Sequence, residues 1–100
     1  MLKRLVDSGK ADSFARYALA LEYRALGRSD DALDAFKELR SRDADYLPQY
    51  LMAGQMLIEK GHPVEAIEWL EQGRELARRK GDTKTLGEIE AALDTAASSA

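Results

Sequence analysis

The sequence has no cysteine and no asparagine, and it contains one histidine and two prolines in 100 residues. Without cysteine, the chain can form neither a disulfide framework nor a thiolate site. A single histidine, His62, cannot supply the ligand set of a zinc site, and as the residue before Pro63 it is better interpreted as a turn or cap residue. No stretch approaches the ~20 apolar residues of a membrane span, and residues 1–10 hold no apolar run typical of a signal peptide. We therefore expect a cytoplasmic protein without metal or cofactor.

The sequence has one charge run, the basic residues Arg74, Arg78, Arg79, Lys80 and Lys84. Basic residues at a helix C-terminus offset the helix dipole, and the alternative is a contact with an acidic peptide. The 15 basic and 18 acidic residues give a formal net charge of −3 and are interspersed along the chain, which disfavours nucleic acid as a partner because nucleic acid requires a concentrated basic surface. Alanine, leucine, glutamate and arginine dominate, and these residues are strong helix formers. No segment alternates apolar and polar residues with the period of a strand. The sequence predicts one small all-α domain.

No catalytic constellation is present either. The chain lacks a glycine-rich phosphate-binding loop, and its serines have no neighbouring base that would activate them. Asp43 and Asp45 are too few for a calcium loop. We predict that the protein is not an enzyme and has no catalytic, cofactor-binding or metal-binding residues.

Capping residues and glycines divide the chain into six predicted helices. Short polar side chains are favoured before a helix, proline is tolerated in the first turn, and glycine commonly ends a helix in a left-handed conformation. The predicted helices run from Leu2 to Ser8, from the caps Asp12 and Ser13 to about Leu26, from the cap Ser29 to about Arg42, from the cap Asp45 to Gly61, from Pro63 to Lys80, and from the cap Asp82 to about Ala97, with a frayed tail over residues 98–100.

The predicted helices alternate between two types. The second and fourth are apolar nearly all round, whereas the third and fifth carry one apolar stripe. A helix that is apolar on every side is buried on several sides or presents an apolar face to a partner.

Identical residues also recur 34 positions apart, at Gly27 and Gly61, at Ala32 and Ala66, and at Arg40 and Arg74.

Two successive segments meet most positions of one 34-residue signature. The first offers Arg16, Leu19, Ala20, Tyr23, Ala32 and Phe36, and the second offers Tyr50, Ala53, Gly54, Leu57, Ala66 and Leu70. With this period and these residues, the chain resembles the tetratricopeptide repeat family. It departs from the pattern where Arg16 replaces a large aromatic residue and where Ala44 and Arg78 replace the closing proline.

The resemblance implies a fold and its division. We expect antiparallel helix-turn-helix repeats stacked as a short right-handed superhelix in a single domain. Residues 1–12 would be part of a preceding repeat, residues 13–46 and 47–80 two full repeats, and residues 81–100 a capping helix, which such arrays need to cover their last apolar face. Small residues such as Ala20 and Gly54 would lie where two helices cross closely. Residues Thr83, Leu86 and Gly87 faintly repeat the signature opening, one residue out of register.

The resemblance also implies a binding surface. The first helix of each repeat lines a concave groove in this family, and the corresponding residues here are Phe14, Tyr17, Leu21, Arg24, Leu51, Gln55 and Ile58. We predict a scaffold that binds a peptide or helix segment of a partner protein in this apolar groove. The lysine and asparagine clamp of chaperone-binding members is missing, so an apolar or amphipathic segment is favoured. The alternative is a homodimer that uses the same groove or the outer helix around Trp69.

Overall fold

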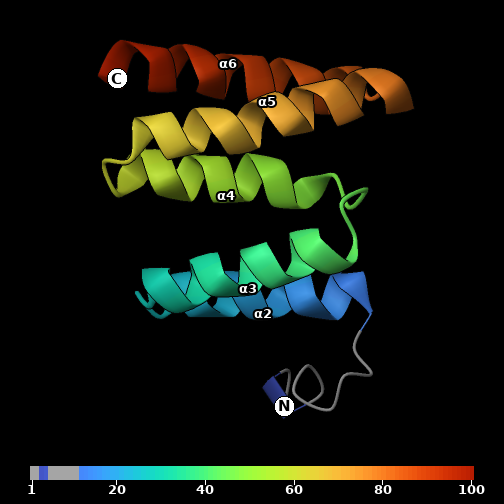
Figure 1. Ribbon diagram of the computed structural model, residues 1–100, viewed down its shortest axis with the longest axis vertical. Helices are drawn as coiled ribbons and strands as arrows, with labels where there is room; N and C mark the ends of the chain where they lie inside the picture. The colour runs from blue at the N-terminus through green and yellow to red at the C-terminus, as the bar shows by residue number, and fades with distance from the viewer. Residues whose placement is uncertain (1–2, 5–11) are drawn as a thin grey trace. The chain divides into compact units, whose positions relative to one another are not determined.

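The computed structural model describes residues 3–4 and 12–100. This part of the chain contains helices and no strand (Figure 1). The all-α prediction is therefore confirmed. The predicted first helix runs from Leu2 to Ser8. Within that range only residues 3 and 4 are described, and both are helical. The helices are α2 (Ser13–Ala25), α3 (Ser29–Arg42), α4 (Pro48–Glu59), α5 (Pro63–Lys80) and α6 (Thr83–Ser99).

The chain divides into two compact units, residues 1–49 and residues 50–100. In the first unit, α2 and α3 form an antiparallel pair. In the second, α5 runs antiparallel to both α4 and α6, so that α4 and α6 run in the same direction (Figure 1). The repeat boundaries and the capping role of residues 81–100 stay predictions.

Local chemistry explains most of the helix ends. The carboxylate of Asp12 accepts the backbone N–H of Ala15 at 2.9 Å, and that of Asp82 accepts the N–H of Thr85 at 3.0 Å. Each carboxylate satisfies one of the N–H groups that a helix start leaves without a partner. Gly27 and Gly61 have φ angles of 75° and 80°, which side chains other than glycine adopt only with strain. These predicted caps and turns are confirmed.

Three predicted caps are wrong. Ser13 is the first residue of α2, and only Asp12 caps that helix. Ser29 is the first residue of α3, and the residue before it, Arg28, makes no capping hydrogen bond through its side chain. Asp45 precedes the start of α4 by three residues, and its own N–H donates to the Asp43 carboxylate at 3.2 Å. The physical reason is Pro48, whose fixed φ suits the first helical position and which begins α4 later than the prediction.

The predicted frayed tail is also wrong, because α6 continues to Ser99. The hydroxyl groups of Ser98 and Ser99 donate to the carbonyl oxygens of Asp94 and Thr95, at 3.0 Å in both cases. Serine hydroxyl groups can bond to the backbone one helical turn earlier. These bonds join the last residues to the preceding turn.

Small residues permit close packing inside each unit. Ala20 and Ala32 in the first unit and Ala66 in the second have no exposed surface. A Cβ atom added to Gly54 would lie 2.5 Å from the Cγ atom of Leu70. Gly54 on α4 is therefore a point of close approach to α5, as its place in the signature predicted.

The aromatic residue Trp69 belongs to the core of the second unit. It is 1% exposed, and its ring centroid lies 6.0 Å from that of Tyr50. A side chain this buried has almost no surface to offer another protein. Trp69 itself is therefore not an exposed contact residue, and self-association through the outer helix stays a prediction.

Candidate functional site

The predicted binding residues of the first unit lie along α2. Phe14, Tyr17, Leu21 and Arg24 are spaced three or four residues apart, which places them on one side of the helix. Phe14 is 68% exposed, and the other three are partly exposed. None of the four belongs to the buried core. This side of α2 is mainly apolar and open to contact.

Tyr17 is held in place by two other aromatic rings. Its ring centroid lies 6.2 Å from that of Phe36 and 5.4 Å from that of Tyr46, both in tilted geometry. Tilted aromatic pairs at these separations stabilise each other beyond the area they bury. Burial, and then the neighbouring Tyr46, raise the pKa of the Tyr17 phenol above its ordinary value of 10.0, while Arg24 opposes the rise. The Tyr17 hydroxyl is therefore protonated at neutral pH and able to donate a hydrogen bond.

The predicted binding residues of the second unit lie along α4. Leu51, Gln55 and Ile58 are spaced four and three residues apart, and all three are partly exposed. The opposite side of α4 supplies the core residues Met56 and Leu57, which are at most 1% exposed. Helix α4, whose residues are mostly apolar, thus has a buried side and a partly exposed side.

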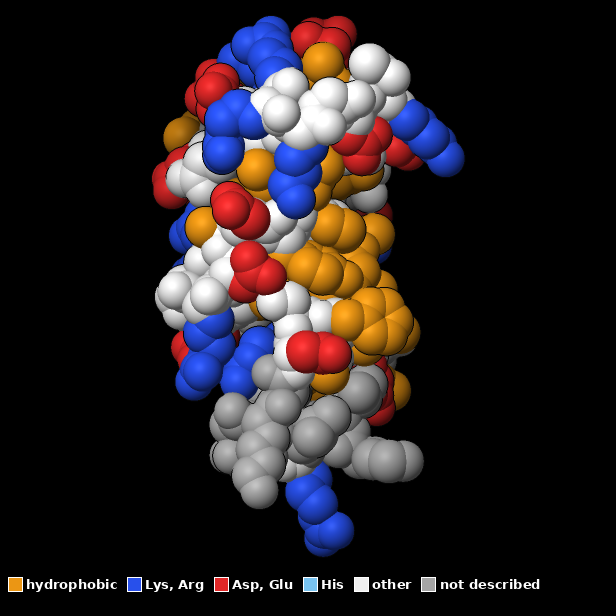
Figure 2. Space-filling model, turned by 90° about the vertical axis from the view of Figure 1, so that its right-hand side faces the viewer, with side chains coloured by type: hydrophobic (Ala, Val, Ile, Leu, Met, Phe, Trp, Pro, Cys, Tyr) orange, Lys and Arg blue, Asp and Glu red, His pale blue; other side chains and the backbone are white. Residues whose placement is uncertain are grey.

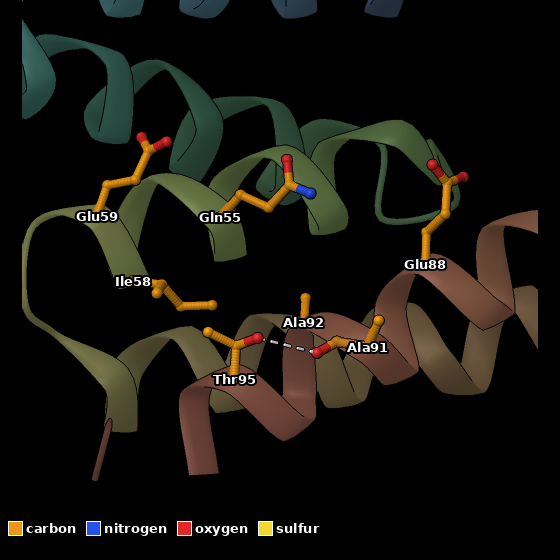
Figure 3. A pocket seen from close by; sticks show the side chains of 7 residues that line it. All are labelled: Gln55, Ile58, Glu59, Glu88, Ala91, Ala92 and Thr95. Carbon is orange, nitrogen blue, oxygen red and sulfur yellow. Dashed lines mark hydrogen bonds between the residues drawn. The ribbon is translucent and has the colours of Figure 1, made fainter. Parts of the chain in front are cut away.

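A groove lies beside this exposed side of α4, and α6 forms its second wall (Figure 3). Its volume is about 590 Å³, which falls in the range of ~300–1,000 Å³ typical of ligand clefts. In Figure 3, the Ile58 side chain extends toward α6, and the Cβ atoms of Ala91 and Ala92 point from α6 toward α4. The groove is lined by Gln55, Ile58 and Glu59 from α4 and by Glu88, Ala91, Ala92 and Thr95 from α6.

Sequence reasoning found Gln55 and Ile58 but missed the wall formed by α6. A signal was present in the sequence. Glu88 and Ala91 follow Gln55 and Ile58 by 33 residues, which is the repeat period less the one-residue shift seen at Thr83, Leu86 and Gly87. Helix α6, which the sequence analysis interpreted only as a cap, thus repeats the groove-lining positions of α4, with Ala91 at the position of Ile58.

The charged groups of the groove are carboxylates. Glu59 and Glu88 are both exposed, and Figure 3 places them toward opposite ends of the groove, with side chains that point to the same side. No lysine, arginine or histidine lines the groove. The hydroxyl of Thr95 donates to the carbonyl of Ala91 at 3.2 Å, so its proton is used within α6.

A smaller hollow of about 220 Å³ lies between α2 and α3 in the first unit. Arg16 lines it and is only 5% exposed, at the position where the repeat signature has a large aromatic residue. Asp31, Asp34 and Glu38 line the same hollow. A long arginine side chain can bury its apolar stem while its charged end remains near acids, which explains how Arg16 occupies the aromatic position.

The described residues contain neither a metal-binding cluster of side chains nor a helix that could span a membrane. Among residues 3–4 and 12–100, no group of three or more histidine, cysteine, aspartate or glutamate side chains is placed to hold a metal ion. No described helix is long and apolar enough to cross a membrane. Figure 2 shows basic and acidic side chains interspersed on part of the face it presents, and most of the apolar side chains gathered beside them.

Two solved structures are similar to this chain: a crystal structure and a solution NMR structure of a tetratricopeptide repeat domain protein from Salinibacter ruber. Each is 36% identical to this chain over 85% of its length. The match covers 96% of the crystallised chain with a TM-score of 0.79, and 86% of the chain studied by NMR with a TM-score of 0.80. The chain belongs to the tetratricopeptide repeat family. No protein-family model matches it, and no curated protein does.

Membership of the tetratricopeptide repeat family confirms the resemblance found in the sequence and supports a general role as a scaffold for protein interactions. It does not say which residues bind. The predicted face consists of two sets, Phe14, Tyr17, Leu21 and Arg24 on α2 and Leu51, Gln55 and Ile58 on α4, which belong to different compact units. Each set is partly exposed, and its role as a binding surface stays a prediction.

Proposed function

We propose that the chain is a protein interaction module that binds a peptide or helix segment of a partner protein in an apolar groove. The observation that carries the proposal is the groove between α4 and α6, with Ile58, Ala91 and Ala92 on its walls. An apolar segment placed there would remove the exposed surface of Ile58 and Ala91 from water, which favours association, whereas Ala92 is already only 8% exposed. The exposed side of α2, with Phe14 and Leu21, supports a similar role for the first unit.

A groove-filling variant and a matched control test this proposal. Ala91 and Ala97 are both exposed residues of α6, but only Ala91 lines the groove. Ala91→Tyr places a ring in the groove, whereas Ala97→Tyr adds the same ring outside it. A displayed library of random 12-residue peptides is selected on the unmodified protein, and the enriched peptides are then measured on both variants.

We expect enriched peptides to bind the unmodified protein and Ala97→Tyr equally, and to lose at least tenfold in affinity on Ala91→Tyr. If no peptide is enriched on the unmodified protein, or if Ala91→Tyr binds as well as the control, the proposed function of this groove is wrong. Circular dichroism of both variants checks that α6 remains folded.

Self-association through the same groove is the alternative that the sequence predicted. Sedimentation of the protein at several concentrations tests it. A dimer that Ala91→Tyr dissociates and Ala97→Tyr preserves would support the homodimer, and a monomer at all concentrations would exclude it. A cytoplasmic location stays a prediction.

A further inference from the structure

Three aromatic side chains of the first unit reach its surface. Tyr46 lies in the segment between α3 and α4, and its ring centroid lies 5.4 Å from that of Tyr17 on α2. Both tyrosines are partly exposed. Phe14, one helical turn before Tyr17 on the same side of α2, is 68% exposed. We call Phe14, Tyr17 and Tyr46 the aromatic patch, and none of the three lines the groove between α4 and α6.

Two carboxylates lie close to the Tyr46 end of the aromatic patch. Burial, and then the negative charges of Asp12 and Asp43, raise the pKa of the Tyr46 phenol above its ordinary value of 10.0. Asp12 is exposed and Asp43 is partly exposed. The cation Arg24 lowers the pKa of Tyr17 but is not among the groups that act on Tyr46. The surroundings of Tyr46 are therefore acidic.

The negative charge of these two carboxylates is not neutralised within the described part of the chain. Asp12 accepts a hydrogen bond from the N–H of Ala15. Asp43 accepts hydrogen bonds from the Ser13 hydroxyl and from the N–H of Asp45. All three donors are neutral, and no described lysine or arginine forms an ion pair with either carboxylate. Because an ionised carboxylate has about four acceptor sites, each can still accept from a cation.

A contact inside the first unit shows how this chain binds an arginine. The guanidinium carbon of Arg28 lies 4.8 Å from the ring centroid of Tyr23, within the ~6 Å typical of cation–π contacts. The same guanidinium pairs with Asp31 at 2.8 Å, so one arginine contacts a ring and a carboxylate together. In the described residues, no arginine or lysine lies over the ring of Tyr46 in this way.

We propose that the aromatic patch binds an arginine side chain of a partner protein, whose guanidinium lies over the ring of Tyr46 and pairs with Asp12 or Asp43. The apolar stem of that arginine would pack on the surface that Phe14 and Tyr17 leave exposed. Arginine fits better than lysine, because a planar guanidinium stacks on a ring while its edge donates to a carboxylate. The inference concerns the first unit, so it holds or fails independently of the groove between α4 and α6.

The test pairs each change in the protein with a matched control. Asp12→Asn removes one of the two charges and keeps a capping side chain, and Asp82→Asn makes the same change at the cap of α6 in the second unit. Tyr46→Leu removes a ring and keeps an apolar side chain. Tyr23→Leu makes the same change at a ring that Arg28 already covers. Circular dichroism checks that each variant remains folded.

The probes are peptides from the displayed library of random 12-residue sequences. Those that are enriched on the unmodified protein and keep their affinity on Ala91→Tyr bind outside the groove, and we expect them to contain arginine. Each is then synthesised with citrulline, a neutral isostere of arginine, and with lysine at the arginine position. Affinity should fall roughly threefold to thirtyfold with citrulline, since a ring contact and an exposed ion pair each contribute modestly. Lysine should give an intermediate loss.

The protein variants should act only through the arginine. We expect Asp12→Asn and Tyr46→Leu each to weaken the arginine peptide by roughly twofold to tenfold. They should weaken the citrulline peptide less, because that peptide has already lost the interaction. Asp82→Asn and Tyr23→Leu should bind both peptides as the unmodified protein does.

Several results would overturn the inference, and they separate it from the proposed function. If no enriched peptide keeps its affinity on Ala91→Tyr, the aromatic patch binds nothing, whereas the function of the groove still stands. Equal affinities of the arginine and citrulline peptides, or enrichment of peptides without arginine that Tyr46→Leu weakens, would make an apolar segment the occupant. Equal losses on a variant and its control would place the binding site elsewhere. A dimer of the protein alone that Tyr46→Leu dissociates would make a second copy of this chain the occupant.

Discussion

Gly73 on α5 shows at the scale of a single residue why the helices of the second unit pack closely. A Cβ atom added there would lie 2.5 Å from the Cβ of Tyr50 and 3.1 Å from the Cδ1 of Ile89. The first distance is shorter than real contacts allow, and a Cβ atom next to the backbone moves little. Gly73 thus permits α4 and α6 to approach α5 from two sides, although the sequence analysis did not single it out.

Gly73→Ala should destabilise the protein. Overpacking at a tight contact costs ~1–3 kcal/mol, and the higher helix propensity of alanine offsets about 1 kcal/mol of this. Gly87 is the matched control, because it lies within α6 with no atom within 4 Å of an added Cβ. Gly87→Ala should therefore stabilise the protein by ~0.5–1 kcal/mol. Urea unfolding measures both changes, and a stabilising Gly73→Ala would contradict the close packing described here.

The cap residue Asp82 gives a prediction that depends on pH. The N–H and the hydroxyl of Thr85 both donate to its carboxylate, at 3.0 Å and 2.8 Å, and these bonds hold the pKa of Asp82 below its ordinary value of 3.8. Because the pKa is lower in the folded state, the stabilising contribution is complete above pH 3.8. It is lost as the pH falls through the lower, folded value.

An NMR titration of the folded protein tests this sign directly. The Thr85 amide resonance should shift with a midpoint below pH 3.8, and Asp82→Asn should abolish that transition while it retains a capping side chain. A midpoint above 3.8 would mean that the cap does not favour the charged carboxylate.

At the scale of the helices, the sequence predicted those elements whose ends carry a decisive residue. Pro63 and Gly81 bound α5 as predicted, and Asp12 starts α2. The errors in the predicted helix ends arose where the sequence offered more than one possible end. Ser29 and Asp45 both suit a cap, but position alone does not show which polar residue directs its side chain to the backbone. At the C-terminus, the bonds from Ser98 and Ser99 to the preceding turn outweighed the tendency of chain ends to fray.

The candidate site was predicted only in part, for a related reason. The residues on α2 and α4 follow from the 34-residue period, whereas Glu88 and Ala91 depend on a shifted copy of it. A one-residue shift rotates a helix face by about 100°, so the register had to come from the structure. Burial of Trp69 likewise could not be read from its place beside the α5 stripe, since it depends on Tyr50 in another helix.

A comparison within α4 tests the division of that helix into two sides. Leu57 has no exposed surface, whereas Leu51 is partly exposed. Leu57→Ala should cost ~2–5 kcal/mol of unfolding free energy because it leaves a cavity. Leu51→Ala should cost about 1 kcal/mol, since a partly exposed side chain buries less area. Chemical denaturation of the two variants measures the difference, and equal costs would mean that Leu51 is core and unavailable to a partner.

At the scale of the whole molecule, each compact unit places a predominantly apolar, partly exposed surface on its first described helix: Phe14, Tyr17 and Leu21 on α2, and Leu51 and Ile58 on α4. Apolar side chains also reach the face shown in Figure 2, with side chains of both charges beside them. Apolar surface that is rimmed by polar residues is typical of interaction sites. Together with membership of the tetratricopeptide repeat family, this arrangement favours a scaffold role.

The central claim, that a partner segment occupies the groove between α4 and α6, is tested most directly by NMR. An enriched library peptide is titrated into the isotope-labelled full chain, and the shifts of the backbone amide resonances are mapped. We predict that the largest changes occur at Gln55, Ile58, Glu88, Ala91 and Thr95. Changes of equal size at exposed residues of α5 such as Glu68 and Glu75, or largest changes confined to α3, would contradict the account.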